Sequence, residues 1–398
     1  MKKRILFLLL ISSGILSAQT WTQLPNFSSN ERDDATAFVI GNTAYCGSGL
    51  SPWFSAFGDF RALNMNNDTW STVASLPNGE HRQYAVSFSS NGKGYIFGGV
   101  DGSRNYRNVL EYNPVLDSWT PKTSLPDSGI SGAASFVIND VAYIVCGRTA
   151  QKVATNTVWA YNMKNDFWQQ KANFPFGNRW RASGESLNGK GYLIFGADSA
   201  NSLHSGFYEY DPVADSWTTL PSFPGQGRNY SSLTAINGQL VVFGGIDSAG
   251  VYLNDLWRYE LGSQTWHQQK SLPAKGRKGG VAFTNGTALY YTTGIDSTNT
   301  RLNETWKCDN PLVGLAEKTA VDIVIYPNPV RNFLRIDFAE TVNGSVQIKI
   351  FNQIGMVVLE TTLDKNARLI DLSALKTGMY ILDIRVEHWA YRHKLIKD

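Results

Sequence analysis

Six tryptophans recur at a constant interval in this sequence, and that interval constrains the fold more than any other feature. Consecutive members of the series are 49 residues apart: Trp21, Trp70, Trp119, Trp168, Trp217 and Trp266. A proline follows five of them at the same distance: Pro77, Pro126, Pro175, Pro224 and Pro273. A fixed period of this length indicates a repeat architecture, in which each unit buries its apolar face against the next one.

Each period has the pattern of strands rather than of helices. Between Arg82 and Trp119 the chain contains the runs YAVSFSS, YIFGG, VLEYNP and DSWTPKTSL, and the turn NGKG separates the first two. Such mixed and alternating runs predict four strands per repeat. Asn-Gly pairs recur at Asn188–Gly189 and Asn237–Gly238, where positive φ angles suit a β-hairpin. We therefore predict an all-β fold.

Paired glycines end the second strand of some repeats, at Gly98–Gly99 and Gly244–Gly245, and an aromatic-Asn or aromatic-Asp pair and then the tryptophan follow. This order resembles the kelch repeat over residues 21–309. The resemblance implies that each repeat forms one blade of a β-propeller. The first, third and sixth repeats carry CGSG, VCGR and TTGI instead of a double glycine. We expect these three blades to be the least regular.

The repeat frame also predicts the number of blades. With strands labelled a to d outward from the axis, the sixth repeat has strands a, b and c but no d. The segment Trp21–Leu24 reads as a d strand without a blade. We expect it to complete the sixth blade and close the ring, because an open strand edge would otherwise template aggregation. The prediction is a six-bladed propeller closed by an N-terminal strand.

The N-terminus reads as a signal peptide over residues 1–18, with basic residues, an apolar run and small residues ending at Ala18. No later stretch approaches ~20 apolar residues, so we expect no transmembrane segment. The net charge of +3 is accounted for by Lys2, Lys3 and Arg4. A nucleic-acid ligand is not expected, because the chain lacks a basic stripe to neutralise phosphates.

The cysteines Cys46, Cys146 and Cys308 are an odd number, and their wide spacing is not the pattern of a disulfide framework. We expect buried free thiols, which is the common state of isolated cysteines. They have neither the close spacing nor the helping histidines of a metal site. The sequence therefore predicts no metal and no cofactor.

One face of the propeller is expected to carry the function. Because strands alternate in direction, the d–a and b–c loops share this face, which we call the loop face. Arginines recur there at the start of strand a: Arg32, Arg82, Arg179, Arg181, Arg228 and Arg277. Acids follow the glycines on the same face: Asp101, Asp198, Asp247 and Asp296. The arginines either bind an anionic or hydroxyl-rich ligand or pair with acids of neighbouring blades to fix the ring.

Departures from the repeat give more specific candidates. The b–c loop of blade 1 carries Trp53, Phe54 and Phe57, and blade 4 carries Trp180 and Glu185. Exposed aromatic rings beside polar groups hold sugar rings in many proteins, but the blade 1 loop could also fold inward as a plug over the channel. Glu185 is either an acid with a perturbed pKa or a hydrogen-bonded structural carboxylate.

The stretch ERDDATAFVIGNTAY, residues 31–45, resembles the first blade of the N-acetylneuraminate epimerases. That resemblance implies proton transfer on a sugar by an acid and arginines at the channel mouth. The carriers here would be Glu185 or Asp198, with Arg32, Arg181 and Arg228. A histidine-rich copper site and a G-x-S-x-G motif are both missing from the sequence.

The repeat stops at Asp309. We expect a linker over residues 310–321 and a small β-sandwich of Ig-like type over residues 322–398. The sandwich resembles the C-terminal sorting domain of type IX secretion cargo in these residues: Tyr326, Pro327, Asn328, Pro329, Gly355, Gly378, Tyr380 and Lys394. The resemblance implies contact with the type IX machinery and export through the periplasm. An accessory sugar-binding module is the alternative.

Together these features predict an exported propeller, at residues 19–309, that acts as a binding module. Its ligand is expected to be a glycan or a protein bound at the loop face. The competing class is a sugar epimerase or mutarotase. The sequence alone identifies neither the ligand nor an activity.

Overall fold

The computed structural model describes residues 19–312, 323–338, 346–352, 356–363, 369–386 and 389–398. The predicted signal peptide, most of the predicted linker and Gly355 lie outside these residues. The chain divides into two compact units between Gly314 and Leu315. The described residues form strands, turns and loops, and none of them is helical. The predicted all-β class is confirmed.

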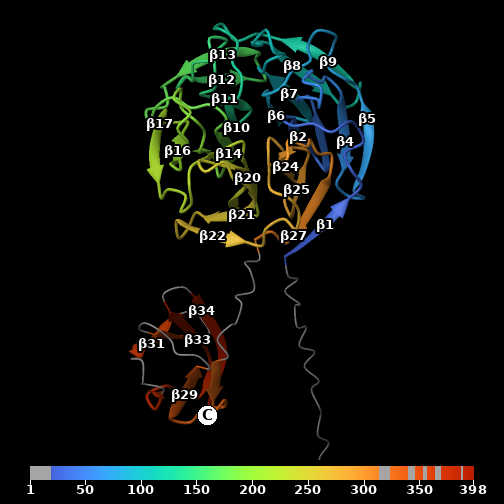
Figure 1. Ribbon diagram of the computed structural model, residues 1–398. Helices are drawn as coiled ribbons and strands as arrows, with labels where there is room; N and C mark the ends of the chain where they lie inside the picture. The colour runs from blue at the N-terminus through green and yellow to red at the C-terminus, as the bar shows by residue number, and fades with distance from the viewer. Residues whose placement is uncertain (1–18, 313–322, 339–345, 353–355, 364–368, 387–388) are drawn as a thin grey trace, which may run out of the picture. The chain divides into compact units, whose positions relative to one another are not determined.

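Within the described residues, the first unit contains six antiparallel sheets of four or five strands that follow one another around a ring, and one short two-stranded sheet (Figure 1). Blade 1 consists of β2 (Thr36–Ile40), β3 (Thr43–Gly47), β4 (Phe60–Asn64) and β5 (Thr69–Val73). Blade 2 consists of β6 (Val86–Ser90), β7 (Lys93–Phe97), β8 (Val109–Asn113) and β9 (Ser118–Lys122). Blade 3 consists of β10 (Ala134–Ile138), β11 (Val141–Val145), β12 (Val158–Asn162) and β13 (Phe167–Lys171).

The remaining blades follow the same plan with short additions. Blade 4 consists of β14 (Ser183–Leu187), β15 (Lys190–Ile194), β16 (Phe207–Asp211) and β17 (Ser216–Leu220). Blade 5 consists of β18 (Arg228–Asn229), β19 (Ser232–Ile236), β20 (Gln239–Asp247), β21 (Tyr252–Glu260) and β22 (Thr265–Gln269). Blade 6 consists of β24 (Val281–Thr284), β25 (Ala288–Thr292), β27 (Thr305–Asp309) and β1 (Thr20–Leu24), next to the short pair β23 (Arg277–Lys278) and β26 (Ile295–Asp296).

The first strand of the chain closes the ring. Strand β1 pairs antiparallel with β27, so that Trp21 lies opposite Cys308. The Gln19 side chain donates to the Lys270 carbonyl at 2.9 Å and to the Cys308 sulfur at 3.3 Å. The N-terminal segment therefore supplies the fourth strand of blade 6. The innermost strands β2, β6, β10, β14, β19 and β24 contact one another in sequence, and β24 returns to β2.

Four of the six repeated tryptophans donate an indole hydrogen bond to the blade before theirs, whereas the indole N–H groups of Trp70 and Trp217 have no hydrogen-bond partner among the described residues. The indole N–H of Trp119 donates to the Ala74 carbonyl of blade 1 at 2.9 Å, and Trp168 donates to Thr123 in the same way. Trp21 makes the equivalent bond to Lys270 at 3.0 Å. Each of these bonds joins equivalent positions of neighbouring repeats, 45 residues apart in the Trp119 and Trp168 bonds, so a constant period suits the four blade contacts that they make.

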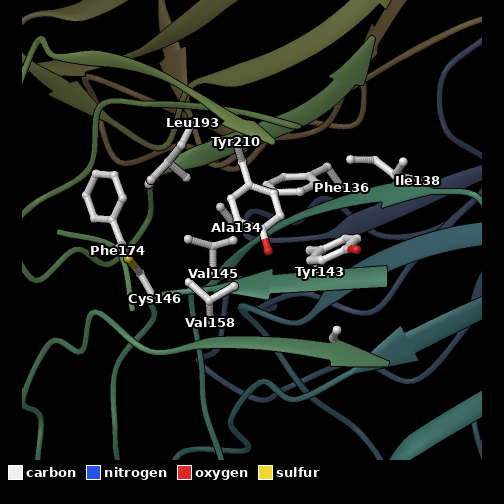
Figure 2. Close-up of a cluster of buried hydrophobic side chains, with 12 residues drawn as sticks. Ala134, Phe136, Ile138, Tyr143, Val145, Cys146, Val158, Phe174, Leu193 and Tyr210 are labelled. Carbon is white, nitrogen blue, oxygen red and sulfur yellow. The ribbon is translucent and has the colours of Figure 1, made fainter. Parts of the chain in front are cut away.

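Aromatic side chains fill the space between neighbouring blades. Figure 2 shows Phe136 and Tyr143 of blade 3 beside Tyr210 of blade 4, and the Tyr143 and Tyr210 ring centroids are 5.2 Å apart. Gly191 leaves room for this contact, since a Cβ there would lie 2.2 Å from the Phe136 ring. Aromatic pairs of this kind contribute about 0.5–1.5 kcal/mol beyond their burial.

The expectation that blades 1, 3 and 6 are irregular is wrong for blades 1 and 3. Each has four strands of five residues, like blades 2 and 4. Where the first glycine is replaced, Ser48, Cys146 and Thr293 adopt φ of 63°, and Phe195 of blade 4 adopts φ of 66°. The neighbouring contacts thus hold a residue with a side chain in a left-handed conformation that glycine adopts freely.

All three cysteines are buried and free, as predicted. Burial raises the pKa of each thiol to about 12. They behave as small apolar residues of the inter-blade core.

The second unit contains two sheets in its described residues. One consists of β28 (Ile323–Tyr326), β29 (Phe333–Phe338) and β32 (Leu369–Asp371). The other consists of β31 (Val357–Leu363), β30 (Val346–Phe351), β33 (Gly378–Val386) and β34 (Trp389–Lys397), paired in that order. A cluster that includes Leu334, Ile348 and Leu382 forms its core. The assignment to the Ig-like type stays a prediction.

Candidate functional site

Most of the predicted arginines are buried and bound within their own blades. Arg32 holds both oxygens of Asp59 at 2.9 and 3.0 Å, and Arg228 holds both oxygens of Asp255 at 2.8 and 3.0 Å. Arg277 pairs with Glu304 at 2.7 Å. In each case the acid lies 27 residues after the arginine, at the start of strand c of the same blade.

Two more arginines of this series, Arg82 and Arg179, find other partners. Arg82 pairs with Glu80 and donates to the Asn108 side chain at 3.2 Å. Arg179 donates to the carbonyls of Phe176 and Asn178. These five of the six arginines are at most 4% exposed, and Arg181 is partly buried. The expected pairing with Asp101, Asp198, Asp247 and Asp296 of neighbouring blades is therefore wrong, because a partner within the same blade is nearer.

Those four acids hold their own loops instead. Asp198 accepts from the backbone N–H groups of Ala200 and Ser202 at 2.9 Å, and the other three do the same in their blades. Slight burial would raise the pKa of Asp101, but hydrogen bonds from the Arg104 and Ser103 backbone lower it to about 2. These acids are loop-organising groups.

A ring of residues in the left-handed conformation surrounds the channel mouth on the loop face. Two positions after the repeated arginine, or its equivalent in blade 3, stand Asp34, Tyr84, Gly132, Arg181, Tyr230 and Gly279, with φ between 54° and 65°. Backbone hydrogen bonds connect successive blades, from Asp34 N to Gly279 O at 2.7 Å and from Arg181 N to Gly132 O at 2.6 Å. Four of the six members thus present non-glycine side chains at the mouth in a costly conformation.

Arg181 lies at the centre of this group. Its guanidinium carbon is 4.2 Å from the Tyr84 ring centroid, 3.7 Å from that of Tyr230 and 3.9 Å from that of Trp180. Asp34, Tyr84, Arg181 and Tyr230 line a cavity of about 120 Å³. Of these four, the sequence identified only Arg181. The position two residues after each repeated arginine could have pointed to the others.

Asp34 is an unusual acid at this mouth. Burial and the neighbouring Asp33 carboxylate raise its pKa to about 7, while Arg181, Tyr84 and Lys278 act in the opposite direction. The carboxyl group therefore changes its charge near neutral pH, beside the Arg181 guanidinium.

Glu185 lies deeper, in the central channel. A cavity of about 360 Å³ is lined by the innermost strands of all six blades, and Glu185 is the only ionisable side chain among its described lining residues. The carboxylate keeps some exposure to the confined channel, but the surrounding walls raise its pKa to about 7 in spite of hydrogen bonds from Ser186, Ala235 and Thr234. Asp198 does not line this cavity and instead pairs with His204 at 3.2 Å.

The aromatic residues of blade 1 are exposed. Trp53 is 62% and Phe54 is 77% accessible to solvent. The alternative in which this loop folds inward as a plug is therefore wrong for these two rings. Trp180 differs, since it is only 9% exposed and lies between the guanidinium groups of Arg148 and Arg181.

The predicted sorting residues are assembled around β34. The Asn328 side chain donates to the Lys394 carbonyl at 2.8 Å and accepts from the Ile396 N–H at 2.9 Å. Tyr380 donates to the Lys376 carbonyl at 2.8 Å, and Gly378 begins β33. Tyr326, Pro327 and Pro329 are exposed next to Asn328.

Comparison with known proteins defines the class of this chain. Residues 45–301 match the family model of the Attractin/LZTR1 β-propeller, and residues 324–398 match that of the secretion system C-terminal sorting domain. The chain belongs to the Attractin/LZTR1 β-propeller family, of kelch type. Its C-terminal unit is a type IX sorting domain, which directs export to the cell surface or the extracellular space. In the described residues, no helix has the length and apolarity needed to cross a membrane.

Individual relatives share the propeller at low identity. Kelch-like protein terF of Aspergillus terreus is 29% identical over 35% of this chain and 35% of its own. N-acetylneuraminate epimerase of Shigella sonnei is 34% identical over 28% of this chain and 31% of its own. The chain thus spans about a third of the length of these curated relatives. The solved structure of YjhT aligns with a TM-score of 0.60 at 18% identity, over 72% of this chain and 99% of that one, which shows the shared fold.

Proposed function

We propose that the exported propeller binds a glycan at its loop face, with Trp53 and Phe54 as the surface on which sugar rings stack. The observation that carries this proposal is the conformation of Phe54, which is 77% exposed and has φ of 62°. A bulky side chain in the left-handed region is a true outlier and costs about 1–2 kcal/mol.

The other blades show what this loop position ordinarily carries. The b–c loops of blades 1, 3, 4, 5 and 6 share one turn, in which a backbone N–H bonds to a carbonyl four residues later. The left-handed residue of that turn is Lys152, Asn201, Gly250 or Asn299 in the other four. Asparagine and glycine suit this conformation. Blade 1 keeps the turn but places phenylalanine there, so its ring is presented at a cost in stability, as at many binding sites.

The surroundings of Phe54 suit a carbohydrate ring. The Arg301 guanidinium lies 4.9 Å from the Phe54 ring centroid and is fixed by Asp33 at 2.6 Å. Trp53 packs edge-on against Phe57 at 5.9 Å. Rigid aromatic rings with a polar neighbour bind at little cost in conformational entropy.

The sharpest test replaces Phe54 with the residue that blades 4 and 6 use. The full exported chain and its Phe54→Asn variant would be screened on a glycan array and by thermal unfolding. We expect the variant to lose binding by roughly tenfold or more and to melt at the same or a higher temperature. Val115, an exposed residue of a c–d turn, provides the control Val115→Ala. Retained glycan binding in Phe54→Asn would contradict the proposal.

A second candidate function is a sugar epimerase or mutarotase. Two observations favour it: the relatives named N-acetylneuraminate epimerase, and a lone channel acid, Glu185, with a pKa of about 7. An acid of this pKa suits proton transfer near neutral pH. The test is N-acetylneuraminate anomer and epimer exchange followed by NMR. If the wild-type protein catalyses the exchange and Glu185→Gln abolishes it, the protein is an enzyme of this class. If the wild-type protein gives no exchange above the uncatalysed rate, this function is excluded.

The processing of the chain follows from its two units. The proposed limits are a signal peptide at residues 1–18, a propeller at 19–309, a linker at 310–321 and a sorting domain at 322–398. Mass spectrometry of the protein recovered from the medium or the cell surface would test both ends. A mature N-terminus at Gln19 is expected.

A further inference from the structure

The six left-handed residues at the channel mouth form three opposed pairs. In a ring of six blades, blade 1 lies opposite blade 4, blade 2 opposite blade 5, and blade 3 opposite blade 6. The pairs are therefore Asp34 with Arg181, Tyr84 with Tyr230, and Gly132 with Gly279. Two pairs carry long side chains and the third carries none, a difference that the 49-residue repeat does not require.

The long side chains meet on the axis of the ring. The ring centroids of Tyr84 and Tyr230 are 6.3 Å apart, although these residues belong to opposite blades. The Arg181 guanidinium carbon lies 4.2 Å from the first centroid and 3.7 Å from the second. The Tyr84 hydroxyl donates a hydrogen bond to the Asp34 carboxyl group. These four side chains, which we call the axial residues, thus occupy the centre of the mouth.

The glycine pair leaves the space that the axial residues need. A Cβ at Gly279 would lie 2.7 Å from Asp34 Oδ1, and a Cβ at Gly132 would lie 3.3 Å from Arg181 Cγ. Side chains at these two positions would therefore displace Asp34 and crowd Arg181. The residues of all six blades are matched to one closed arrangement.

The axial residues lie between the loop face and the channel that contains Glu185. The mouth cavity is lined by Ala182 and Gly280, and the channel cavity by Gly184 and Ala282, two residues further along the same segments. Two residues of extended chain span about 7 Å. The two cavities have no described lining residue in common. A molecule that arrives from the loop face therefore meets the axial residues before it reaches Glu185.

Side-chain contacts keep the mouth closed. Arg181 rests on aromatic rings and forms no ion pair with the residues that the structure describes. Rotation of an arginine or tyrosine side chain opens the centre without movement of a strand. Tyr84, Arg181 and Tyr230 have φ between 54° and 56°, which is costly for bulky residues. Glycine fills the same position in two blades, so ring closure does not require this cost.

We infer that the axial residues form a gate, which closes the loop-face end of the channel and controls the access of small polar molecules to Glu185. The gate does not depend on glycan binding at the blade 1 loop, so either proposal can fail without the other. If the channel is catalytic, a sugar from the loop face reaches the acid only through the open gate.

Thiol labelling of the full exported chain tests the inference. Ser135→Cys places one thiol on the channel wall. The three native cysteines are buried and have thiol pKa values of about 12, so they should not react. The probe is iodoacetamide, a small neutral polar reagent, and mass spectrometry measures the labelling rate. In this background, Tyr84→Gly with Tyr230→Gly should raise the rate by roughly tenfold or more, because the centre of the mouth is then open.

Two matched controls accompany the double variant. Lys152→Gly makes a similar change at a left-handed position, with φ of 64°, on the exposed b–c loop of blade 3. Tyr230→Phe keeps the ring on the axis. Both should label as slowly as the Ser135→Cys protein. If thermal unfolding shows that the glycine variant is not folded, asparagine at both tyrosine positions replaces it, since asparagine also adopts the left-handed conformation.

Two results would overturn the inference. One is an equal labelling rate with and without the axial tyrosines in folded protein, because access to the channel would then not depend on them. The other is equally fast labelling in Lys152→Gly, because the increase would then reflect a general loosening of the propeller. Fast labelling confined to the variants that lack both rings would support the gate.

Discussion

At the scale of single residues, environment decides what each ionisable group does. Arg32 and Arg277 pair with an acid inside their own blades and act as structural cross-links, whereas Arg181 is held among aromatic rings and has no ion pair with the residues that the structure describes. Asp34 and Glu185 are acids whose burial raises the pKa to about 7. These two acids should therefore dominate the pH dependence of stability near neutrality.

The raised pKa values determine whether a higher pH stabilises or destabilises the folded protein. An acid with a raised pKa in the folded state binds its proton more tightly than in the unfolded state, so the free energy of unfolding falls as pH rises from about 4 to about 7 and then levels off. Asp34→Asn should remove the part of this decrease in the free energy of unfolding that Asp34 causes, which is roughly 2–4 kcal/mol between pH 4 and pH 7. Urea denaturation at pH 4.5 and pH 8 measures it. Asp127→Asn, at an exposed loop position, should keep the wild-type difference, and a wild-type difference in Asp34→Asn would contradict this assignment.

At the scale of elements, the sequence was most informative where the fold repeats. Each period carries the tryptophan and four strands, so the number and order of the strands could be predicted from the pattern between Arg82 and Trp119. The left-handed ring at Asp34 and Tyr230 was not predicted, because the side chain at this position changes from blade to blade and only the constant offset of two residues from the repeated arginine marks it. The partner of Arg228 was also missed, since Asp255 lies 27 residues away and no local pattern connects them.

The closing strand β1 offers a prediction at this scale. Trp21 donates to the Lys270 carbonyl at 3.0 Å and packs against Phe243 with ring centroids 5.6 Å apart. Trp21→Ala should lower the free energy of unfolding by ~2–3 kcal/mol, from lost burial and one hydrogen bond. Trp53→Ala is the matched control, because its ring is 62% exposed. Equal melting temperatures for the two variants would mean that β1 does not hold the ring closed.

At the scale of the whole molecule, folding and export belong to separate units. The propeller closes on itself through β1 and β27, and the sorting domain has its own core around Ile348 and Leu382. Deletion of residues 315–398 should leave a propeller with unchanged melting temperature that stays in the periplasm. Cell fractionation with an antibody to the propeller measures this. Truncated protein in the medium or on the surface would contradict the export route.

The central claim is that residues that break the 49-residue repeat bind the ligand, while residues that follow the repeat hold the ring. The most direct measurement compares glycan binding and melting temperature in Phe54→Asn, Trp53→Ala, Arg228→Gln and Arg277→Gln. We predict lost binding with a nearly unchanged melting temperature for the first two. The last two should keep binding while folded but melt several degrees lower, since each leaves a partly buried acid unpaired. The opposite result would contradict the account: the first two variants unfold, while the two arginine variants stay folded and lose binding.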